Sequence, residues 1–318
     1  MDKQVGIIIL NYNNWEDTIN CIDSIEGYNS YPIKYFVVDN GSTREGCLAS
    51  LRSSLGKRFG DEFIIMKEGD TIPPRFPKCI LLGSSINDGY AKGNNKGLEL
   101  IYKDDEITHI LILNNDIIFV EDILPALINA KEGLKDSAFV SPLLYKKDGK
   151  SIDYNCARQN YTNWNLILTY LMMHRNMFGY IARYSKRILM LKDNPQLIVQ
   201  PSLPIELPSG SCMFISKDEL KQLEGFDSNT FLYFEENILF KKVQKKGWQN
   251  YLIPSLHCIH LGAQSSKETA NWFILASYFR SSIYYLENYG DLTFLQNVCL
   301  KLCKWCFPIK IYIMKMTR

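Results

Sequence analysis

Isolated carboxylates follow apolar runs of this sequence at two points. Asp39 ends one run, and Asp116 lies three residues beyond the run His109–Leu113. A carboxylate just past a buried strand is costly to leave unpaired, and a divalent cation that bridges it to a diphosphate would remove that cost. Two local alternatives stay open. Asp116 would cap a helix that begins near Val120, and Asp39–Ser42 has the composition of a turn.

A pair of adjacent carboxylates, Glu235 and Glu236, follows the aromatic run Phe231–Phe234. Beside aromatic bulk, one carboxyl of such a pair can have a raised pKa, which suits a general base. The alternative is that both acids stabilise the first turn of the next helix. Further along the chain, His260 could supply an imidazole ligand to a metal, although a lone histidine is more often structural.

The segment Asn87–Gly97 is rich in glycine and amide side chains and carries two lysines. Its backbone can approach a ligand closely, and Lys92 could meet a phosphate. The segment lacks both the G-x-G-x-x-G order of dinucleotide-binding folds and the G-K-[ST] of a P-loop. Neither of those phosphate sites is therefore predicted.

The elements that must position these residues alternate between strands and helices. Short apolar runs with β-branched residues indicate strands buried on both faces, and segments with helical spacing follow them. The expected strands are 5–10, 35–39, 78–82, 109–113 and 251–253. The expected helices are 15–25, 120–134, 217–223 and one that ends at Lys246, and residues 89–102 are expected to be a loop that enters a helix. This alternation predicts an α/β fold with a parallel, doubly wound sheet, in which ligands bind beyond the carboxyl ends of the strands. Asn11, Asp39 and Asp116 are therefore expected to converge.

Two further segments are basic, aromatic and without clear strands. Residues 151–200 are expected to be a helical insertion in a catalytic domain of residues 1–265, and residues 266–318 a helical tail. Neither the stretch between Tyr154 and Lys192 nor the chain after Asp291 contains an acid. Such segments suggest an anionic partner, either a lipid headgroup layer or a polyprenyl-phosphate acceptor, and a solvated basic face is an equal alternative. Their basic residues are Arg158, Arg175, Arg183, Lys186, Arg187 and Lys192, then Lys301, Lys304, Lys310, Lys315 and Arg318.

Composition limits the class of protein. The chain has 318 residues, of which 46% are hydrophobic and 22% charged, which is ordinary for a globular protein with a sizeable core. Its first residues do not resemble a secretory signal, and no apolar stretch is long enough to predict a spanning helix. The nine cysteines are expected to be reduced. Cys299, Cys303 and Cys306 have a spacing used by iron–sulfur clusters, but their apolar, basic, helical context favours a helix stripe.

The order of these features resembles the family 2 glycosyltransferases of the GT-A fold, and among them the rhamnosyltransferase-like enzymes of bacterial cell-surface polysaccharide assembly. The resemblance extends over roughly residues 4–290. It is carried by Ile9-Leu-Asn-Tyr-Asn13, Val37-Val-Asp-Asn-Gly-Ser42, the segment Asn87–Gly97, Leu113-Asn-Asn-Asp-Ile117, Gly225-Phe-Asp227 with Phe231–Glu236, and His260-x-Gly262. The fold that the resemblance implies is a Rossmann-like, mostly parallel central sheet flanked by helices.

The resemblance implies roles for the residues that match its motifs. Asn11, Tyr12 and Asn13 are expected to line the nucleotide pocket, and Asp39 to hydrogen-bond the base. The donor should also contact Asn87, Gly89, Lys92, Asn94, Asn114 and Asn115, while Ser209 and Gly210 are expected on the acceptor side.

Asp116 matches the last acid of the family's D-x-D motif and is expected to bind Mg²⁺ or Mn²⁺ through the donor diphosphate. Asn114 replaces the first acid, and an amide is a poorer metal ligand than a carboxylate. His260 resembles a further metal contact found in some members. Glu236 matches the catalytic base, with Glu235 as the alternative.

The implied reaction is an inverting transfer of a sugar from a UDP- or dTDP-sugar to a hydroxyl of a glycan acceptor, expected to be lipid-linked. The expected location is cytoplasmic, on the inner face of the cell membrane, with a membrane surface as a partner, no nucleic acid, and a homodimer left open. Phe294, Val298, Leu302 and Trp305 would suit an interfacial helix. The alternatives are a sugar-nucleotide nucleotidyltransferase and a non-catalytic binder of nucleotide sugars or glycans.

Overall fold

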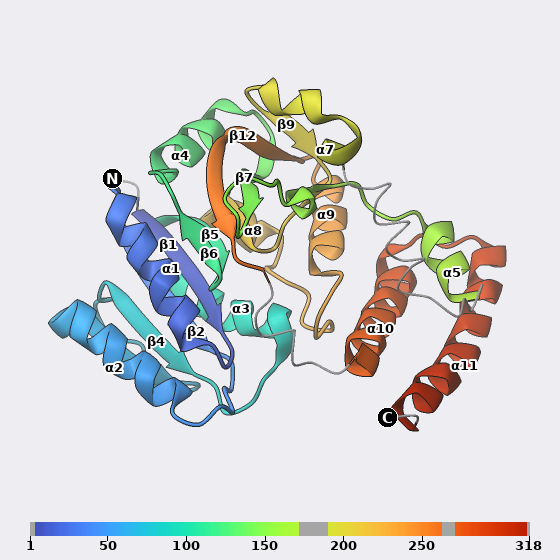
Figure 1. The fold of residues 1–318 in the computed structure, drawn as a ribbon, viewed down its shortest axis with the longest axis horizontal. Helices are drawn as coiled ribbons and strands as arrows, with labels where there is room; N and C mark the ends of the chain where they lie inside the picture. The colour runs from blue at the N-terminus through green and yellow to red at the C-terminus, as the bar shows by residue number, and fades with distance from the viewer. Residues whose placement is uncertain (1–3, 172–189, 263–270, 317–318) are drawn as a thin grey trace.

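The computed structural model describes residues 4–171, 190–262 and 271–316. Within these ranges, ten strands form one mixed sheet in the order β3-β4-β2-β1-β5-β11-β7-β12-β6, with β9 paired to β12. The first five strands in this order are parallel to one another, whereas β11 is antiparallel to β5 and to β7. The sheet confirms the predicted α/β class with a mostly parallel sheet (Figure 1).

The bounds of the elements are as follows. The strands are β1 Gln4–Asn11, β2 Ile33–Asp39, β3 Phe63–Lys67, β4 Cys79–Gly83, β5 Ile107–Asn114, β6 Ile117–Phe119, β7 Ser137–Lys146, β8 Ala157–Arg158, β9 Leu203–Ile205, β10 Leu207–Pro208, β11 Cys212–Ser216 and β12 Gln249–His260. The α-helices are α1 Trp15–Tyr28, α2 Cys47–Phe59, α3 Gly89–Ile101, α4 Leu124–Gly133, α5 Asn163–Leu171, α7 Met190–Asp193, α8 Lys217–Gln222, α9 Glu235–Lys245, α10 Asn271–Tyr289 and α11 Phe294–Met316.

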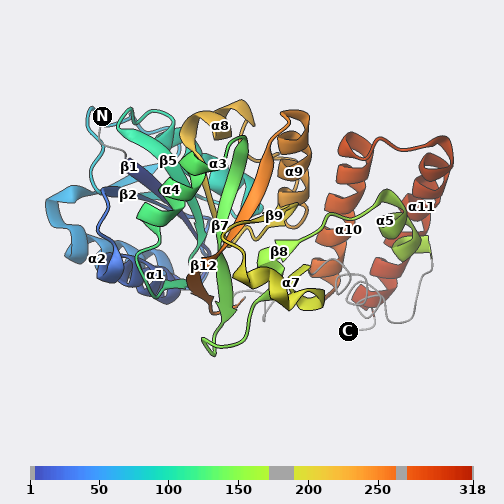
Figure 2. The same cartoon turned by 90° about the horizontal axis from the view of Figure 1, so that it is seen from above.

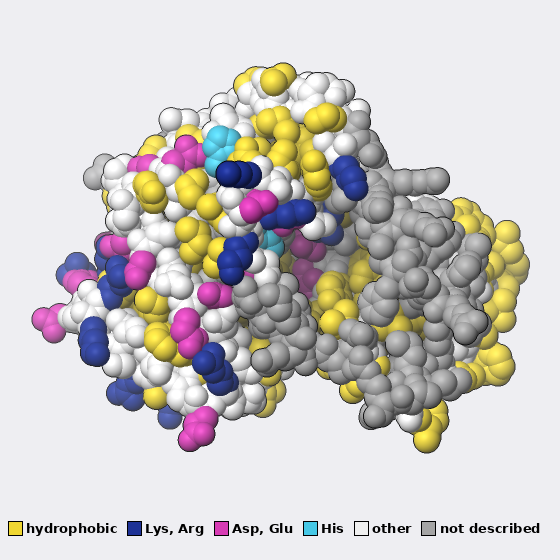
Figure 3. All heavy atoms as spheres, in the orientation of Figure 1, with side chains coloured by type: hydrophobic (Ala, Val, Ile, Leu, Met, Phe, Trp, Pro, Cys, Tyr) yellow, Lys and Arg dark blue, Asp and Glu magenta, His cyan; other side chains and the backbone are white. Residues whose placement is uncertain are grey.

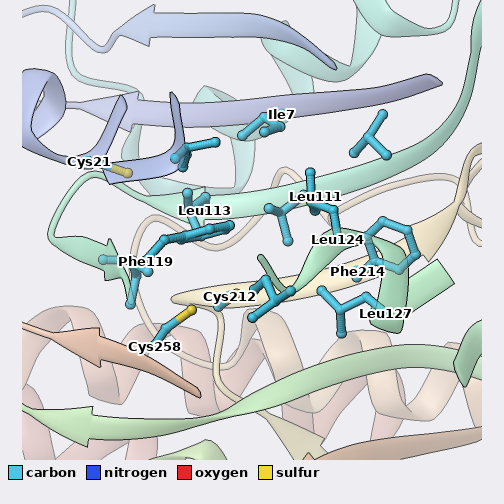
Figure 4. Packing of buried hydrophobic residues seen from close by; sticks show 14 of the residues in the cluster. Ile7, Cys21, Leu111, Leu113, Phe119, Leu124, Leu127, Cys212, Phe214 and Cys258 are labelled. Atoms are coloured by element: carbon cyan, nitrogen blue, oxygen red, sulfur yellow. The ribbon is translucent and has the colours of Figure 1, made fainter. Parts of the chain in front are cut away.

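Two hydrophobic layers cover the faces of the sheet. On one face, side chains of β1, β5 and β11 such as Ile7, Leu111 and Phe214 pack with α1, α2 and α4 (Figure 4). On the other face, Ile8 and its neighbours pack with α3, α8 and α9. The central strands are buried on both faces because helices cover both sides, which explains their continuous apolar runs.

The register of the central strands sets the position of the polar residues that follow them. Asn11 pairs with Asp39 between β1 and β2, and Leu10 pairs with Asn114 between β1 and β5. The carboxyl ends of three parallel strands therefore lie at one edge of the sheet. This register brings the predicted polar residues to the same side of the molecule.

A third hydrophobic core lies outside the sheet. It joins the insertion helix α5 to the C-terminal helices α10 and α11 and to Phe234 and Ile238 of the α9 region. Figure 2 shows these helices side by side beyond α9. The insertion and the tail, which are far apart in sequence, thus pack together. Arg175, Arg183, Lys186 and Arg187 of the predicted basic insertion lie outside the described residues.

The structure corrects several details of the predicted elements. Helix α4 begins at Leu124, with Ile123 as its N-cap, so Asp116 does not cap it. Residues Ile117–Phe119, directly after Asp116, form β6, which pairs with β12. Strand β12 is much longer than residues 251–253 and includes His260 itself. Helix α2 and strands β3 and β7 were not predicted. No described helix is both long enough and apolar enough to cross a membrane.

Candidate active site

A pocket of about 290 Å³ opens where α9, the 209–211 turn and the end of β5 meet. Helix α10 contributes Tyr278 and strand β8 contributes Arg158. In Figure 3, acidic side chains are visible in a hollow of the surface between the sheet and the C-terminal helices. The pocket is lined by Tyr90, Asn114, Asn155, Arg158, Tyr161, Ser209, Gly210, Ser211, Leu232, Tyr233, Phe234, Glu235, Glu236, Asn237 and Tyr278.

Glu236 is held in this pocket by contacts to one of its oxygens. The backbone N–H of Gly210 donates to Oε1 at 3.0 Å, and Arg158 Nη2 lies 3.4 Å from the same atom. Gly210 is fixed in turn because its carbonyl accepts a hydrogen bond of 2.6 Å from the Tyr90 hydroxyl. The side chain of Glu236 is 19% exposed. The carboxylate is therefore anchored through Oε1 and can offer Oε2 to a substrate proton.

Glu235 has a different environment from its neighbour. Its side chain is buried, and among the described residues its Oε1 has no hydrogen-bond partner. Burial, and next the negative charge of Glu236, raise the pKa of Glu235 to about 8. Both acids also occupy the first turn of α9, so the helical alternative and the pocket are compatible.

The backbone that presents the two acids is strained. Tyr233 and Phe234 both have φ of 72°, the left-handed region that side chains with a Cβ rarely adopt. Each such residue costs about 1–3 kcal/mol and persists only where the surroundings hold it. Here Ser281 of α10 donates a 2.8 Å hydrogen bond to the Leu232 carbonyl, and the Phe234 ring packs against Tyr278. Helix α10 therefore supports the loop before Glu235.

Asp116 and His260 meet beside the pocket. His260 Nε2 lies 3.4 Å from Asp116 Oδ2 and from Oγ of Ser211, a pocket residue. The other ring nitrogen, Nδ1, lies 2.8 Å from Asp153 Oδ2. Burial opposes the charged ring, but the hydrogen bonds and charges of the two aspartates outweigh it and raise the pKa of His260 to about 10.

The Asp116–His260 pair is compatible with a divalent cation. Oδ1 of Asp116 is buried, and no hydrogen-bond partner for it exists among the described residues. A carboxylate oxygen and an imidazole nitrogen are donors that Mn²⁺ accepts. No group of three or more His, Cys, Asp or Glu in the described part of the chain could hold a metal. Two donors are too few to fill the coordination shell of a metal, so a metal bound here would need further ligands from outside this pair.

A second polar cluster follows β1 and β2. Asn11 Nδ2 donates to Asp39 Oδ1 at 2.7 Å, and the Ser42 hydroxyl donates to the same oxygen at 2.6 Å. The Ser42 N–H donates to the other oxygen of Asp39, so this carboxylate closes a turn, as the local alternative expected. Asn13, at φ 58°, accepts from the backbone N–H groups of Thr43 and Arg44, and Tyr12 beside it is half-buried.

The Asn87–Asn94 segment connects this cluster to the loop that carries the acids. Asn87 Oδ1 accepts from Asn40 Nδ2 and from the Gly89 N–H. Gly89 has φ of 81°, and a Cβ there would collide with the carbonyl of Phe231, so only glycine fits. Asn94 is fully buried in α3, where its Nδ2 donates to the Tyr90 carbonyl.

Lys92 and Asn115 are not among the residues that line the Glu236 pocket. Lys92 is exposed and lines a separate groove of about 630 Å³ with Glu68, Asp70 and Lys96. Asn115 Nδ2 donates to the Asn14 carbonyl and to Thr18 at the start of α1. In contrast, Asn114 and Ser209 do line the Glu236 pocket. The predicted donor residues therefore occupy one edge of the sheet but not one cavity.

Arg158, Tyr90 and Asp153, which contact Glu236, Gly210 and His260 respectively, are among the residues of the site that the sequence did not predict. The signal for Arg158 was its position in a stretch without acids. Asp153 gave no local signal, because its partner His260 is 107 residues away in sequence.

The family described as "Glycosyl transferase family 2" matches residues 6–193, which is more than half of the chain. The chain belongs to this family. The match includes β1, β2, the Asn87–Gly97 segment and Asp116, whereas Glu236 and His260 lie beyond it. The resemblance stated from the sequence is thus confirmed.

Relatives of known name agree with this assignment. The chain is 24% identical over 203 residues to an N-acetylglucosaminyl-diphospho-decaprenol L-rhamnosyltransferase of Mycobacterium tuberculosis, covering 60% of this chain and 62% of the relative. It is 23% identical over 176 residues to rhamnosyltransferase WbbL of Escherichia coli, covering 54% of this chain and 60% of that protein. The chain therefore spans about three fifths of the length of these relatives.

A solved structure supports the fold. The crystal structure of GalNAc-T7 with UDP, GalNAc and Mn²⁺ superimposes with a TM-score of 0.60 at 10% identity, covering 91% of this chain and 49% of that one. At this identity the likeness concerns the fold alone. The predicted GT-A fold is confirmed.

Proposed function

We propose that this protein is an inverting glycosyltransferase that moves a sugar from a UDP- or dTDP-sugar to a hydroxyl of a glycan acceptor in cell-surface polysaccharide synthesis. The observation that carries the proposal is the anchored carboxylate of Glu236 in a pocket that Asn114 also lines. The pocket residue Ser211 contacts His260, the partner of Asp116. Membership of the family and the names of the relatives support the same reaction class.

Glu236 acts as the general base in this proposal. Its Oε2 takes the proton of the acceptor hydroxyl while Oε1 stays bound to the Gly210 N–H. The acceptor oxygen forms a bond to the anomeric carbon from the face opposite the diphosphate. The bond between that carbon and the diphosphate oxygen breaks, and the nucleoside diphosphate leaves with the electron pair. Configuration is inverted because attack and departure occur on opposite faces, and proton removal of this kind contributes about 10²–10⁴-fold.

Asp116 and His260 would hold Mg²⁺ or Mn²⁺ against the donor diphosphate, where the cation would neutralise the charge of the leaving group. Asn114 lines the same pocket as Glu236 and would hydrogen-bond the donor. The nucleoside would bind at the edge of the sheet formed by Asn11, Tyr12, Asn13 and Asp39. The other predicted donor residues would lie around it: Asn87, Gly89, Lys92, Asn94 and Asn115.

Ser209, Gly210 and Arg158 line the pocket and would form its acceptor side. The name of one relative includes a sugar that is linked to decaprenol through a diphosphate. We therefore propose a glycan on a polyprenyl diphosphate as the acceptor. A lipid-linked acceptor would keep the enzyme on the inner face of the cell membrane.

The test is transfer to a synthetic lipid-diphosphate sugar with a panel of nucleotide sugars and Mn²⁺, followed by mass spectrometry. An L-rhamnosyl donor comes first in the panel because of the relatives' names. A product heavier by one sugar residue, formed by the wild type and not by Glu236→Gln, is expected. If the protein binds a nucleotide sugar of the panel but neither transfers nor hydrolyses any of them, it is a non-catalytic binder instead. Release of diphosphate from a nucleoside triphosphate and a sugar phosphate would identify a nucleotidyltransferase.

A further inference from the structure

Helix α11 carries an apolar stripe whose side chains are largely exposed in the described part of the chain. The stripe residues recur at alternating intervals of three and four, and each is between 41% and 72% exposed. This spacing places them on one side of a helix. In Figure 3 hydrophobic side chains cover the outer edge of the molecule over α11. The stripe consists of Leu295, Val298, Leu302, Trp305, Ile309, Tyr312 and Met316.

The opposite face of α11 is already occupied. Leu300, Cys303 and Phe307 are buried in the third core, and the Phe307 ring stacks on Phe279 of α10 with centroids 4.1 Å apart. This buried face fixes the helix on the protein without help from the stripe. The stripe is therefore a surface that the folded protein presents to something else, because monomeric proteins rarely leave so much contiguous apolar surface exposed.

The charges around the stripe identify the kind of partner. After Asp291 the chain has five basic residues and no acid. Lys301 and Lys304 are exposed beside the stripe, and Lys304 is 2.6 Å from Glu287, a pair that is nearly half exposed and thus weak. An apolar stripe bordered by lysines matches a partner with an apolar interior and an anionic outer layer.

A second copy of the chain is a less suitable partner for the stripe. Intervals of three and four also occur in coiled coils, whose flanking positions normally bear charges of opposite sign. The flanks of this stripe offer lysines and no acid on α11 to pair with them. Trp305 and Tyr312 are amphipathic rings that favour the boundary between lipid and water.

We propose that the α11 stripe docks on an anionic lipid bilayer, with its lysines at the headgroups. The inference deepens the proposed function and rests on it for the identity of the acceptor. Helix α10 lies between α11 and the pocket: it contributes Tyr278 to the pocket and Phe279 to the contact with α11. Packed helices are about 8–10 Å apart, and α11 and α10 both lie between the docked bilayer and the pocket, so docking would hold the pocket roughly two helix layers from the bilayer.

The experiment is co-sedimentation of the full chain with two kinds of vesicle, phosphatidylcholine alone and phosphatidylcholine with phosphatidylglycerol. The test variant combines Leu302→Glu, Trp305→Glu and Ile309→Glu, which leaves the buried face of α11 intact. The matched control combines Tyr28→Glu, Leu48→Glu and Val199→Glu, three exposed apolar residues elsewhere on the surface. Circular dichroism checks that both variants fold.

The wild type and the control should bind the anionic vesicles, and the stripe variant should bind about a hundredfold more weakly. Lys301→Gln with Lys304→Gln should weaken binding about tenfold on the anionic vesicles only. No sedimentation of the wild type, or equal binding of the wild type and the stripe variant, would overturn the proposal. Equal affinity of the wild type for both kinds of vesicle would overturn the claim that the stripe prefers an anionic bilayer. A dimer by light scattering that only the stripe variant dissociates, with vesicle binding unchanged, would identify a second copy as the occupant.

Transfer to a short-chain, water-soluble acceptor separates this proposal from the proposed function. The stripe variant should match the wild type in that assay because its pocket is untouched. If the wild type transfers sugar but does not bind vesicles, only the docking proposal fails. If it binds vesicles through the stripe but transfers no sugar, only the proposed function fails.

Discussion

The backbone N–H of Gly210 donates a 3.0 Å hydrogen bond to Oε1 of Glu236, across 26 residues of sequence. Tyr90 holds the same glycine from the other side through its hydroxyl. Three elements, α3, the turn after β10 and the first turn of α9, therefore meet at one carboxylate. A backbone donor fixes the acid more firmly than a flexible side chain would, which suits a group that must face a substrate hydroxyl.

This relationship makes Gly210→Ala an informative change. A Cβ at Gly210 would lie 2.8 Å from Glu236 Oε1 and 3.1 Å from the Tyr90 hydroxyl, so the carboxylate must move. We expect kcat to fall about tenfold to a hundredfold, because small displacements of a reacting group are costly. Steady-state transfer kinetics measure the effect. Gly27→Ala is the control, since nothing lies within 4 Å of a Cβ there. Equal losses in the two variants would contradict the argument.

Glu236→Gln separates binding from chemistry. The amide keeps the shape of the side chain and can still accept from Gly210, but it cannot take a proton from the acceptor. We expect kcat to fall about 10²–10⁴-fold with donor affinity nearly unchanged. Single-turnover transfer and calorimetric titration with the nucleoside diphosphate measure the two quantities. Near-normal turnover in this variant, with a large loss in Glu235→Gln, would move the base to Glu235.

The sequence could predict the site residues that come directly after a buried strand. The buried runs of β1, β2 and β5 and the polar residues at their ends could be located because periodicity and turn composition are local signals. Parallel pairing then aligned Asn11 with Asp39, as expected.

Other parts of the site depend on contacts that no local pattern encodes. Arg158 reaches Glu236 because the two-residue strand β8 pairs with β10, which is a tertiary event. The dependence of the acid-bearing loop on α10 arises from packing between segments that looked like an insertion and a tail. The start of α4 differs from the prediction because the residues after Val120 have helical spacing, whereas the helix begins only at Leu124, with Pro125 in its first turn.

The raised pKa of Glu235 predicts a pH dependence of stability. An unfolded chain binds this proton with a pKa near 4.5, whereas burial and the charge of Glu236 raise the folded value to about 8. Between these values the folded state keeps a proton that the unfolded state releases, so stability falls as pH rises from about 5 to about 8. The Glu235→Gln variant has no such carboxyl group, so it should not show this loss of stability as pH rises.

Urea unfolding of the wild type and Glu235→Gln across this pH range measures the difference. The free energy of unfolding of the wild type should decline relative to the variant by an amount on the order of a few kcal/mol. Glu99→Gln, at an exposed position of α3, is the control and should follow the wild type. Parallel curves for the wild type and Glu235→Gln would mean that Glu235 is ionised in the folded protein.

Asp153 is predicted to govern metal affinity without touching the metal. Its Oδ2 lies 2.8 Å from Nδ1 of His260, which leaves Nε2 facing Asp116. Carboxylates in this position orient a histidine ligand, and their loss typically costs 10–100-fold in metal affinity. We expect Asp153→Asn to weaken Mn²⁺ binding in the presence of UDP by about that factor, and Asp116→Asn to weaken it further. Mn²⁺ binding is followed by electron paramagnetic resonance. Asp148→Asn, in an exposed turn nearby, should bind Mn²⁺ like the wild type. An unchanged affinity in Asp153→Asn would mean that His260 is not a ligand.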